Sequence, residues 1–164
     1  MWRMNEAMRI WLSAVATLAL SACASTATPT EGVTRVVSTT SFGMCVGYCT
    51  TRLEISEGEA VLIRQARGGR GAPQDLPDQR TSRPLTTAEW QDIQRLAARA
   101  DFEAMPDVVG CPDCADGGAE GLVVESAGET ESVSFEHGAS LASAQPLLNR
   151  VRALRAQLTP EEAR

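Results

Sequence analysis

The sequence predicts an α+β fold in which an antiparallel sheet of about four to five strands is built from two β-hairpins. Each hairpin is followed by one helix, and both helices are expected to pack on one face of the sheet. Two observations predict this class: paired segments alternate apolar and polar residues with period two, and two further segments repeat apolar residues at helical spacing. A length of 164 residues, 43% of them hydrophobic, suits a single domain with its own core.

The first hairpin is predicted from the first half of the chain. Residues 33–39 are rich in β-branched side chains and are expected to form a strand, followed by a loop with glycine and cysteine over 41–49. Residues 51–56 alternate with period two, residues 57–59 suit a turn, and residues 60–65 suit the return strand.

Residues 67–84 show no apolar period and are rich in glycine and proline near their start, so they predict a long surface loop. Its charges suit a solvated loop, and the functional alternative is a flap that contacts an anion. The charged residues are Arg67, Arg70, Arg80, Arg83, Asp75 and Asp78.

A capping box formed by Thr86 and Glu89 predicts the start of the first helix. The helix is expected to end near Phe102, before Pro106. Trp90 and Phe102 are therefore core candidates rather than parts of a ligand site. The apolar face comprises Trp90, Ile93, Leu96, Ala97 and Ala100.

The second half of the chain repeats this order of elements. Residues 105–120 predict a loop, and residues 122–126 and 132–136 predict the second hairpin. The last helix is expected to start near Ser143, because Pro146 is tolerated only in the first turn. Its apolar face comprises Leu141, Ala144, Leu148, Val151, Leu154 and Leu158.

Residues 1–22 have the features of a secretory signal peptide, with two arginines before a short apolar stretch. The sequence Leu20-Ser21-Ala22-Cys23 resembles the lipobox of bacterial lipoproteins. The resemblance implies that Cys23 becomes the first residue of the mature chain and carries a diacylglycerol and an acylated amine, with chains such as palmitate. Several acyl chains would anchor the protein permanently in a membrane. The alternative is an ordinary secreted protein cleaved nearby.

The predicted domain organisation follows from this N-terminal signal. Residues 1–22 are the signal peptide, 23–32 a lipidated flexible tether, 33–158 a single α+β domain and 159–164 a tail. By analogy with other lipoproteins, Ala24 does not resemble an inner-membrane retention signal. We therefore expect a lipid anchor in the cell outer membrane, with the domain facing the periplasm.

Four further cysteines form a C-x₃-C pair, Cys45 and Cys49, and a C-x₂-C pair, Cys111 and Cys114. In an oxidising compartment they predict two disulfides, and four cysteines allow three connectivities. One alternative is a tetrahedral zinc site made by all four thiolates. The other is an exchange dithiol at Cys111 and Cys114, although the neighbouring Asp113 disfavours a thiolate there.

Several function classes lack their usual signals. The net charge is −6, which makes nucleic acid a poor partner, and all 15 basic residues are arginine, so no lysine serves Schiff-base chemistry. The lone histidine, His137, is expected in a turn and has no triad partners. An acidic segment lacks EF-hand spacing and is expected to be a solvated loop rather than a calcium site; it comprises Asp107, Asp113, Asp116 and Glu120. The sequence thus predicts no catalytic residue, cofactor or metal.

Residues 41–49 (SFGMCVGYC) and the hairpin that follows resemble a family of bacterial domains of unknown function, often lipoproteins, with the pattern C-F-G-x-C-P. Here Thr50 stands in place of the proline, and three residues separate the cysteines. The likeness extends over 33–158 and includes Phe135-Glu136-His137-Gly138 before the last helix. It implies an α+β domain and a bridge between Cys45 and Cys49, which favours local bridges in both pairs. It implies no activity.

These observations predict a lipid-anchored cell-envelope protein with a non-enzymatic domain that binds an envelope protein partner or supports the envelope. Its contact with the membrane would run through the lipid on Cys23. The alternative is a thiol-exchange or zinc-handling envelope lipoprotein that uses the two cysteine pairs.

Overall fold

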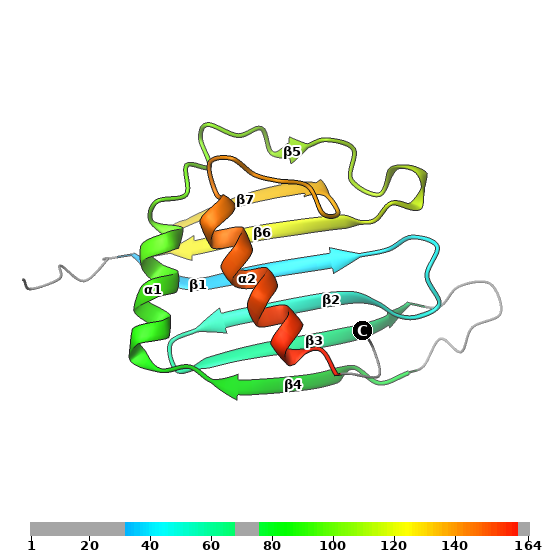
Figure 1. Ribbon diagram of the computed structural model, residues 1–164, viewed down its shortest axis with the longest axis horizontal. Helices are drawn as coiled ribbons and strands as arrows, with labels where there is room; N and C mark the ends of the chain where they lie inside the picture. Colours follow the sequence, from blue (N-terminus) through cyan, green and yellow to red (C-terminus); the bar gives the residue numbers. More distant parts are fainter. Residues whose placement is uncertain (1–31, 68–75, 161–164) are drawn as a thin grey trace, which may run out of the picture.

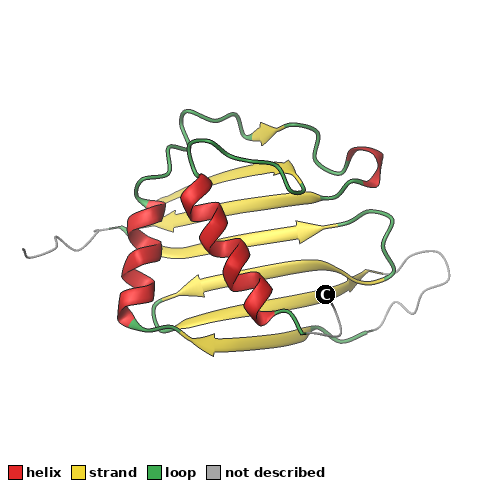
Figure 2. Cartoon of the chain, viewed as in Figure 1, coloured by secondary structure: helices red, strands yellow, loops and turns green. Residues whose placement is uncertain are grey.

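A seven-stranded mixed sheet carries two helices on one of its faces (Figures 1 and 2). The computed structural model describes residues 32–67 and 76–160. The strand order is β4-β3-β2-β1-β6-β7-β5, and every neighbouring pair is antiparallel except β5 and β7. The elements are β1 (Val33–Ser41), β2 (Gly47–Ser56), β3 (Glu59–Arg67), β4 (Gln79–Pro84), α1 (Thr87–Ala97), β5 (Val108–Val109), the short 3₁₀ helix η1 (Cys114–Asp116), β6 (Ala119–Ser126), β7 (Glu129–Glu136) and α2 (Gln145–Leu158).

The predicted α+β class is confirmed, and so are both predicted hairpins. In the first hairpin, Leu53 of β2 lies opposite Leu62 of β3, and both are fully buried. In the second hairpin, Leu122 of β6 lies opposite Val133 of β7. The alternation is legible in the sequence because one face of these strands packs against the helices.

The prediction of four to five strands is wrong, and β4 is one of the missed strands. It lies in the segment predicted as a long loop, where it pairs with β3 from Glu59↔Pro84 to Arg64↔Gln79. Most of its residues are exposed, because β4 is an edge strand. Backbone hydrogen bonds to β3 therefore create this strand, and no apolar pattern marks it.

The second predicted loop, over 105–120, also contains missed structure. Val108 and Val109 form the short strand β5, parallel to Ser134 and Phe135 of β7. The end of the segment already belongs to β6, which begins at Ala119. The sheet is consequently mixed rather than purely antiparallel.

Helix α1 begins with the predicted capping box, in which the Thr86 hydroxyl accepts from the Glu89 backbone N–H. It ends at Ala97, so the predicted end near Phe102 is wrong. Tighter hydrogen bonds close the helix, from Arg99 N–H to the Leu96 carbonyl and from Ala100 N–H to the Ala97 carbonyl. Phe102 still reaches the core and is buried, as is Trp90.

Helix α2 crosses the sheet diagonally and supplies much of the core (Figure 1). Pro146 lies in its first turn, as predicted. Every residue of the predicted apolar face is buried: Leu141, Ala144, Leu148, Val151, Leu154 and Leu158. In residues 32–67 and 76–160, no helix is both long and apolar enough to cross a membrane.

The two ends of the sheet carry different connections. At one end, Gly32 accepts a hydrogen bond from Ala127 in the β6–β7 turn, and the β2–β3 turn lies at the same end. At the other end, Ser41 lies opposite both Thr50 and Ala119, next to the β1–β2 and β5–β6 connections. We call the second end the cysteine end, since both cysteine pairs lie there.

Some predictions concern residues outside the described part of the chain. These are the signal peptide 1–22, the lipid-attachment residue Cys23 and the tether as far as residue 31. Arg70 and Asp75 of the predicted long loop and residues 161–164 of the predicted tail also lie outside it.

Candidate functional site

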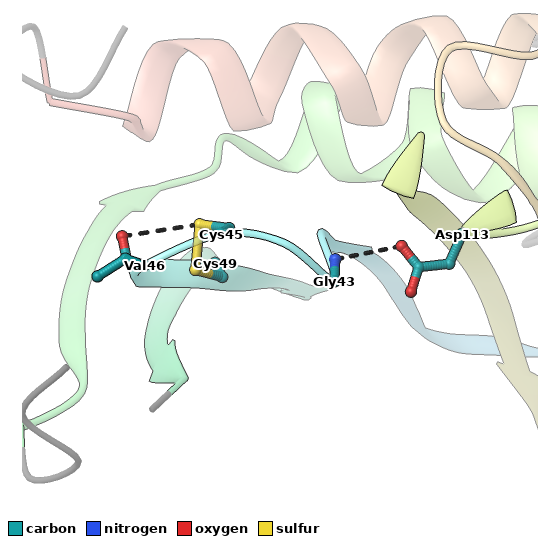
Figure 3. Close-up of a disulfide and its surroundings, with 5 residues drawn as sticks. All are labelled: Gly43, Cys45, Val46, Cys49 and Asp113. Carbon is teal, nitrogen blue, oxygen red and sulfur yellow. Dashed lines mark hydrogen bonds between the residues drawn. A yellow bond between two sulfur atoms is a disulfide. The ribbon is translucent and has the colours of Figure 1, made fainter. Parts of the chain in front are cut away.

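The β1–β2 connection is a short loop braced by a disulfide between Cys45 and Cys49 (Figure 3). Their Cα atoms are 5.5 Å apart, a normal spacing for a bridge. Cys49 is only 1% exposed because it lies in β2, whereas the prediction had it in the loop. The Phe42 N–H also donates to the Cys49 carbonyl, at 3.2 Å, which closes the base of the loop.

The outer part of this loop is apolar and exposed. Met44 is 80% exposed and Val46 is 73% exposed, on either side of Cys45. Single exposed apolar residues are ordinary on a protein surface. Here, however, two of them lie on a loop whose backbone is held at both ends. We call Met44, Cys45 and Val46 the tip.

The β5–β6 connection holds the second disulfide, between Cys111 and Cys114, whose Cα atoms are 5.4 Å apart. Both cysteines are exposed. Three residues here other than glycine adopt left-handed backbone conformations: Asp113 (φ 59°), Ala115 (φ 51°) and Asp116 (φ 61°). Such conformations are unfavourable for residues with a Cβ atom, so this loop is conformationally strained.

Two contacts join the cysteine loops to each other and to the turn after β7. The Gly43 N–H donates to a carboxylate oxygen of Asp113, at 3.2 Å (Figure 3). The Phe42 ring lies against the His137 ring with their centroids 4.7 Å apart. His137 lies in a turn, as predicted, but it also contributes to this packing.

Gly118 is the junction of these contacts. Its carbonyl accepts from the backbone N–H groups of both Asp113 and His137. Its φ is +85°, and a Cβ atom there would lie 2.6 Å from the Phe42 ring. Only glycine therefore fits this position without displacing Phe42.

A buried ion-pair cluster joins β6 to α2 near the cysteine end. Glu120 is 3% exposed and accepts hydrogen bonds from Arg152 at 2.8 Å and from the Gly138 N–H at 2.9 Å. Arg155 lies 3.5 Å from the same carboxylate and also donates to the Ser38 hydroxyl. The expectation that Glu120 belongs to a solvated acidic loop is therefore wrong.

The charged groups in this cluster shift one another's pKa values. Burial by itself raises the pKa of Glu120, but hydrogen bonds from Arg152 and Gly138 and the charges of both arginines outweigh it. The pKa of Glu120 is thus lowered, and the group is ionised at neutral pH. Burial lowers the pKa of Arg155, and the charge of Glu120 partly opposes that effect. The cluster is a paired structural network in which the carboxylate is already satisfied.

The cluster was missed in the sequence, although a signal for it exists. Glu120 lies two and four residues before Leu122 and Val124, which face the core. Because side chains alternate between the two faces of a strand, the Glu120 side chain is expected to face the core as well. A charged residue at such a position needs a partner. Arg152 and Arg155 are three residues apart on α2, which puts them on one side of that helix.

The four cysteines of the alternative zinc site do not come together in the structure. The four cysteines lie in two separate local pairs rather than in one cage. Across residues 32–67 and 76–160, no group of three or more His, Cys, Asp or Glu side chains is arranged to hold a metal ion. Two disulfide-bonded pairs, with the local connectivity that the family resemblance implies, fit this geometry best.

Of the arginines in the predicted flap, Arg83 is held in an ion-pair cluster. Arg83 of β4 pairs with Glu89 of α1, at 2.8 Å, and Arg150 of α2 reaches the same carboxylate at 3.4 Å. These contacts join the edge of the sheet to both helices.

A small pocket between the end of α1 and the start of α2 lies apart from these groups. Its lining offers no acid–base pair, since Arg99 is the one charged residue in it. The lining residues are Leu96, Arg99, Ala100, Ser143, Ala144 and Pro146.

A comparison with models of known protein families finds no match to this chain, and neither does a comparison with curated proteins. The resemblance to lipoproteins and to the C-F-G-x-C-P family therefore remains a prediction. The candidate site that the geometry defines is the cysteine end, with the tip as its most exposed apolar feature.

Proposed function

We propose that this chain is a cell-envelope lipoprotein, anchored through Cys23, whose folded domain binds a protein partner with the tip. The role is non-enzymatic: the domain holds an apolar recognition element at a distance from the membrane. The observation that carries the proposal is the pair of exposed apolar residues, Met44 and Val46, on a loop braced by a disulfide.

The direction of β1 supports this arrangement (Figure 1). The strand starts at Val33 and ends at Ser41, beside the tip. A strand of nine residues rises roughly 30 Å. A tether entering before residue 33 would therefore hold the tip on the side of the domain away from the anchor, where a second envelope component can reach it.

The bracing of the loop also supports binding. The tip is constrained by the disulfide on one side and by the hydrogen bond from Gly43 to Asp113 on the other. A loop that is ordered before binding loses less conformational freedom when a partner covers it. Methionine, here Met44, is one of the residue types enriched at protein–protein interfaces.

The anchor is tested with the full chain and a Cys23→Ser variant. We expect the full chain to partition into the membrane fraction and to carry the mass of a diacylglycerol and an acyl chain. Cys23→Ser should lose both. Ser25→Ala is the matched control and should behave as the unchanged chain. An unlipidated full chain would contradict the proposed anchor.

The tip is tested by photo-crosslinking in cells. A photoreactive residue replaces Val46, and the control replaces Glu57, which is exposed in the β2–β3 turn at the opposite end of the sheet. We expect one discrete adduct from position 46 and none from position 57. The adduct should disappear when Met44→Glu is added. Equal adducts from both positions, or an adduct that Met44→Glu leaves intact, would reject the tip as the binding surface.

A further inference from the structure

The two disulfides differ in accessibility. Cys111 and Cys114 are both exposed, whereas in the other bridge Cys45 is only partly exposed and Cys49 is 1% exposed within β2. Thiol–disulfide exchange requires an external thiolate to reach a disulfide sulfur. An external reductant therefore reaches the Cys111–Cys114 bridge more readily than the Cys45–Cys49 bridge.

The two disulfides also differ in the backbone that they hold. Asp113, Ala115 and Asp116 adopt left-handed conformations within or beside the Cys111–Cys114 ring. No residue other than glycine does so in the β1–β2 loop. Opening the Cys111–Cys114 bridge would let these three residues relax, and strained or exposed disulfides are the ones most easily reduced.

The strained ring is connected to the tip through Asp113. This residue lies between the two cysteines, and its carboxylate accepts from the Gly43 N–H, one residue before Met44 (Figure 3). Its own left-handed conformation directs the carboxylate, so relaxation of the ring would withdraw it. One hydrogen bond thus links the ring of one disulfide to the other cysteine loop.

We propose that Cys111–Cys114 is a regulatory redox site, reduced by an external dithiol, and that its reduction releases Gly43 from Asp113 and loosens the tip. The effect on a binding partner rests on the proposed function, whereas the redox step and the release of Gly43 do not.

The exchange balances with a dithiol as co-reactant. A thiolate of the dithiol attacks one sulfur of the bridge, and the S–S bond breaks as a mixed disulfide forms. The second thiol of the dithiol then resolves the mixed disulfide. Two electrons and two protons pass to Cys111 and Cys114, which become thiols, while the dithiol becomes a disulfide.

The redox step is tested on the full-length chain, expressed from residue 1 and purified in detergent. The chain is equilibrated in buffers of stepped ratios of reduced to oxidised dithiothreitol, alkylated, and analysed by peptide mass. We expect Cys111–Cys114 to be half-reduced at a ratio at least tenfold lower than Cys45–Cys49, a difference of about 30 mV. A smaller difference, or the reverse order, overturns the proposal.

The coupling is tested by the hydrogen exchange of the Gly43 amide, followed by NMR. At a ratio that reduces only Cys111–Cys114, we expect exchange at least threefold faster than in the oxidised chain. Asp113→Ala should produce the same acceleration without reduction, and reduction should add nothing further. Asp116→Ala is the matched control, because no hydrogen bond links Asp116 to Gly43 among the described contacts. Unchanged exchange on reduction, or equal acceleration in Asp116→Ala, overturns the coupling.

These readouts are independent of any partner. If the crosslink at position 46 fails while the redox order and the Gly43 exchange behave as expected, the proposed function fails and the redox site stands. If the crosslink succeeds while both pairs reduce together, the regulatory inference fails alone.

Discussion

The two cysteine loops close rings of similar size, with cysteines four and three residues apart, yet they occupy different surroundings. The β1–β2 loop ends within the sheet, where Cys49 is a buried strand residue. The β5–β6 loop is exposed and contains three residues other than glycine in left-handed backbone conformations. Spacing alone therefore does not distinguish the two bridges, because their burial and backbone conformations come from the surrounding fold.

The largest expected effect comes from removing the support beneath the exposed loop. Glu120→Ala leaves Arg152 and Arg155 without their carboxylate in a buried setting, which costs about 3–5 kcal/mol of unfolding free energy. Urea unfolding followed by circular dichroism measures it. Glu129→Ala, at an exposed position of β7, is the control and should change stability by less than about 0.5 kcal/mol. A loss below about 1 kcal/mol in Glu120→Ala would show that the cluster is not a stabilising pair network.

Removing the disulfide between Cys45 and the buried Cys49 should have the next largest effect. The double variant Cys45→Ala with Cys49→Ala removes the ring that restricts the unfolded chain, and it leaves a smaller side chain at the buried position 49. Loss of the ring alone lowers the free energy of unfolding by about 2 kcal/mol. The same urea experiment, without reductant, gives the difference. A double variant as stable as the unchanged chain would remove the contrast between the two loops.

Removing the exposed disulfide should cost less. In Cys111→Ala with Cys114→Ala, a similar entropic loss is partly offset by relaxation of Asp113, the one left-handed residue inside the ring, which is worth roughly 1–2 kcal/mol. We therefore expect less than about 1 kcal/mol of destabilisation. The two double variants serve as each other's controls in one unfolding series. A loss equal to that of the Cys45 and Cys49 variant would argue against strain in the exposed loop.

Acid should produce the smallest effect, at a third location away from both loops. The Arg83 guanidinium, together with the Thr86 N–H, lowers the pKa of Glu89 to about 2. Because this folded-state pKa lies below the unfolded value of about 4.5, the contribution of Glu89 is present above pH 4.5. It is lost as the pH falls from about 4.5 towards 2.

Glu89→Gln tests this acid dependence. The variant should be less stable than the unchanged chain at pH 6, and the difference should shrink as the pH falls towards 2. Thermal unfolding over this pH range measures it, with Glu129→Ala as a control that keeps the original slope. A difference that stays constant with pH would reject the role of Glu89. Such a result would leave the contrast between the cysteine loops untouched.

Several elements were predictable because the signal for each is local. Period two in 51–56 and 60–65 marks the first hairpin, and Thr86 with Glu89 marks the start of α1. The buried face of α2 follows from helical spacing. By contrast, β4 has mostly exposed residues and exists through its pairing with β3, and the chain leaves α1 at Ala97 before Phe102 enters the core.

The candidate site was predictable in its residues but not in its arrangement. The sequence marks all four cysteines and suggests local bridges through the family resemblance. The pairing of Gly43 with Asp113 joins residues 70 positions apart and carries no local signal. The burial of Glu120 was detectable from its parity in β6, but its two arginine partners belong to α2, 32 and 35 residues later.

The sequence by itself determined the α+β class, both hairpins, the cap of α1 and the apolar face of α2, because these depend on residue order within a single element. Only the tertiary structure decided that both cysteine loops meet at one end of the sheet, that Cys49 is buried while Cys111 and Cys114 are exposed, and that Glu120 is paired. These features depend on which strands are neighbours, and strand order is set by packing between distant segments rather than by any one of them.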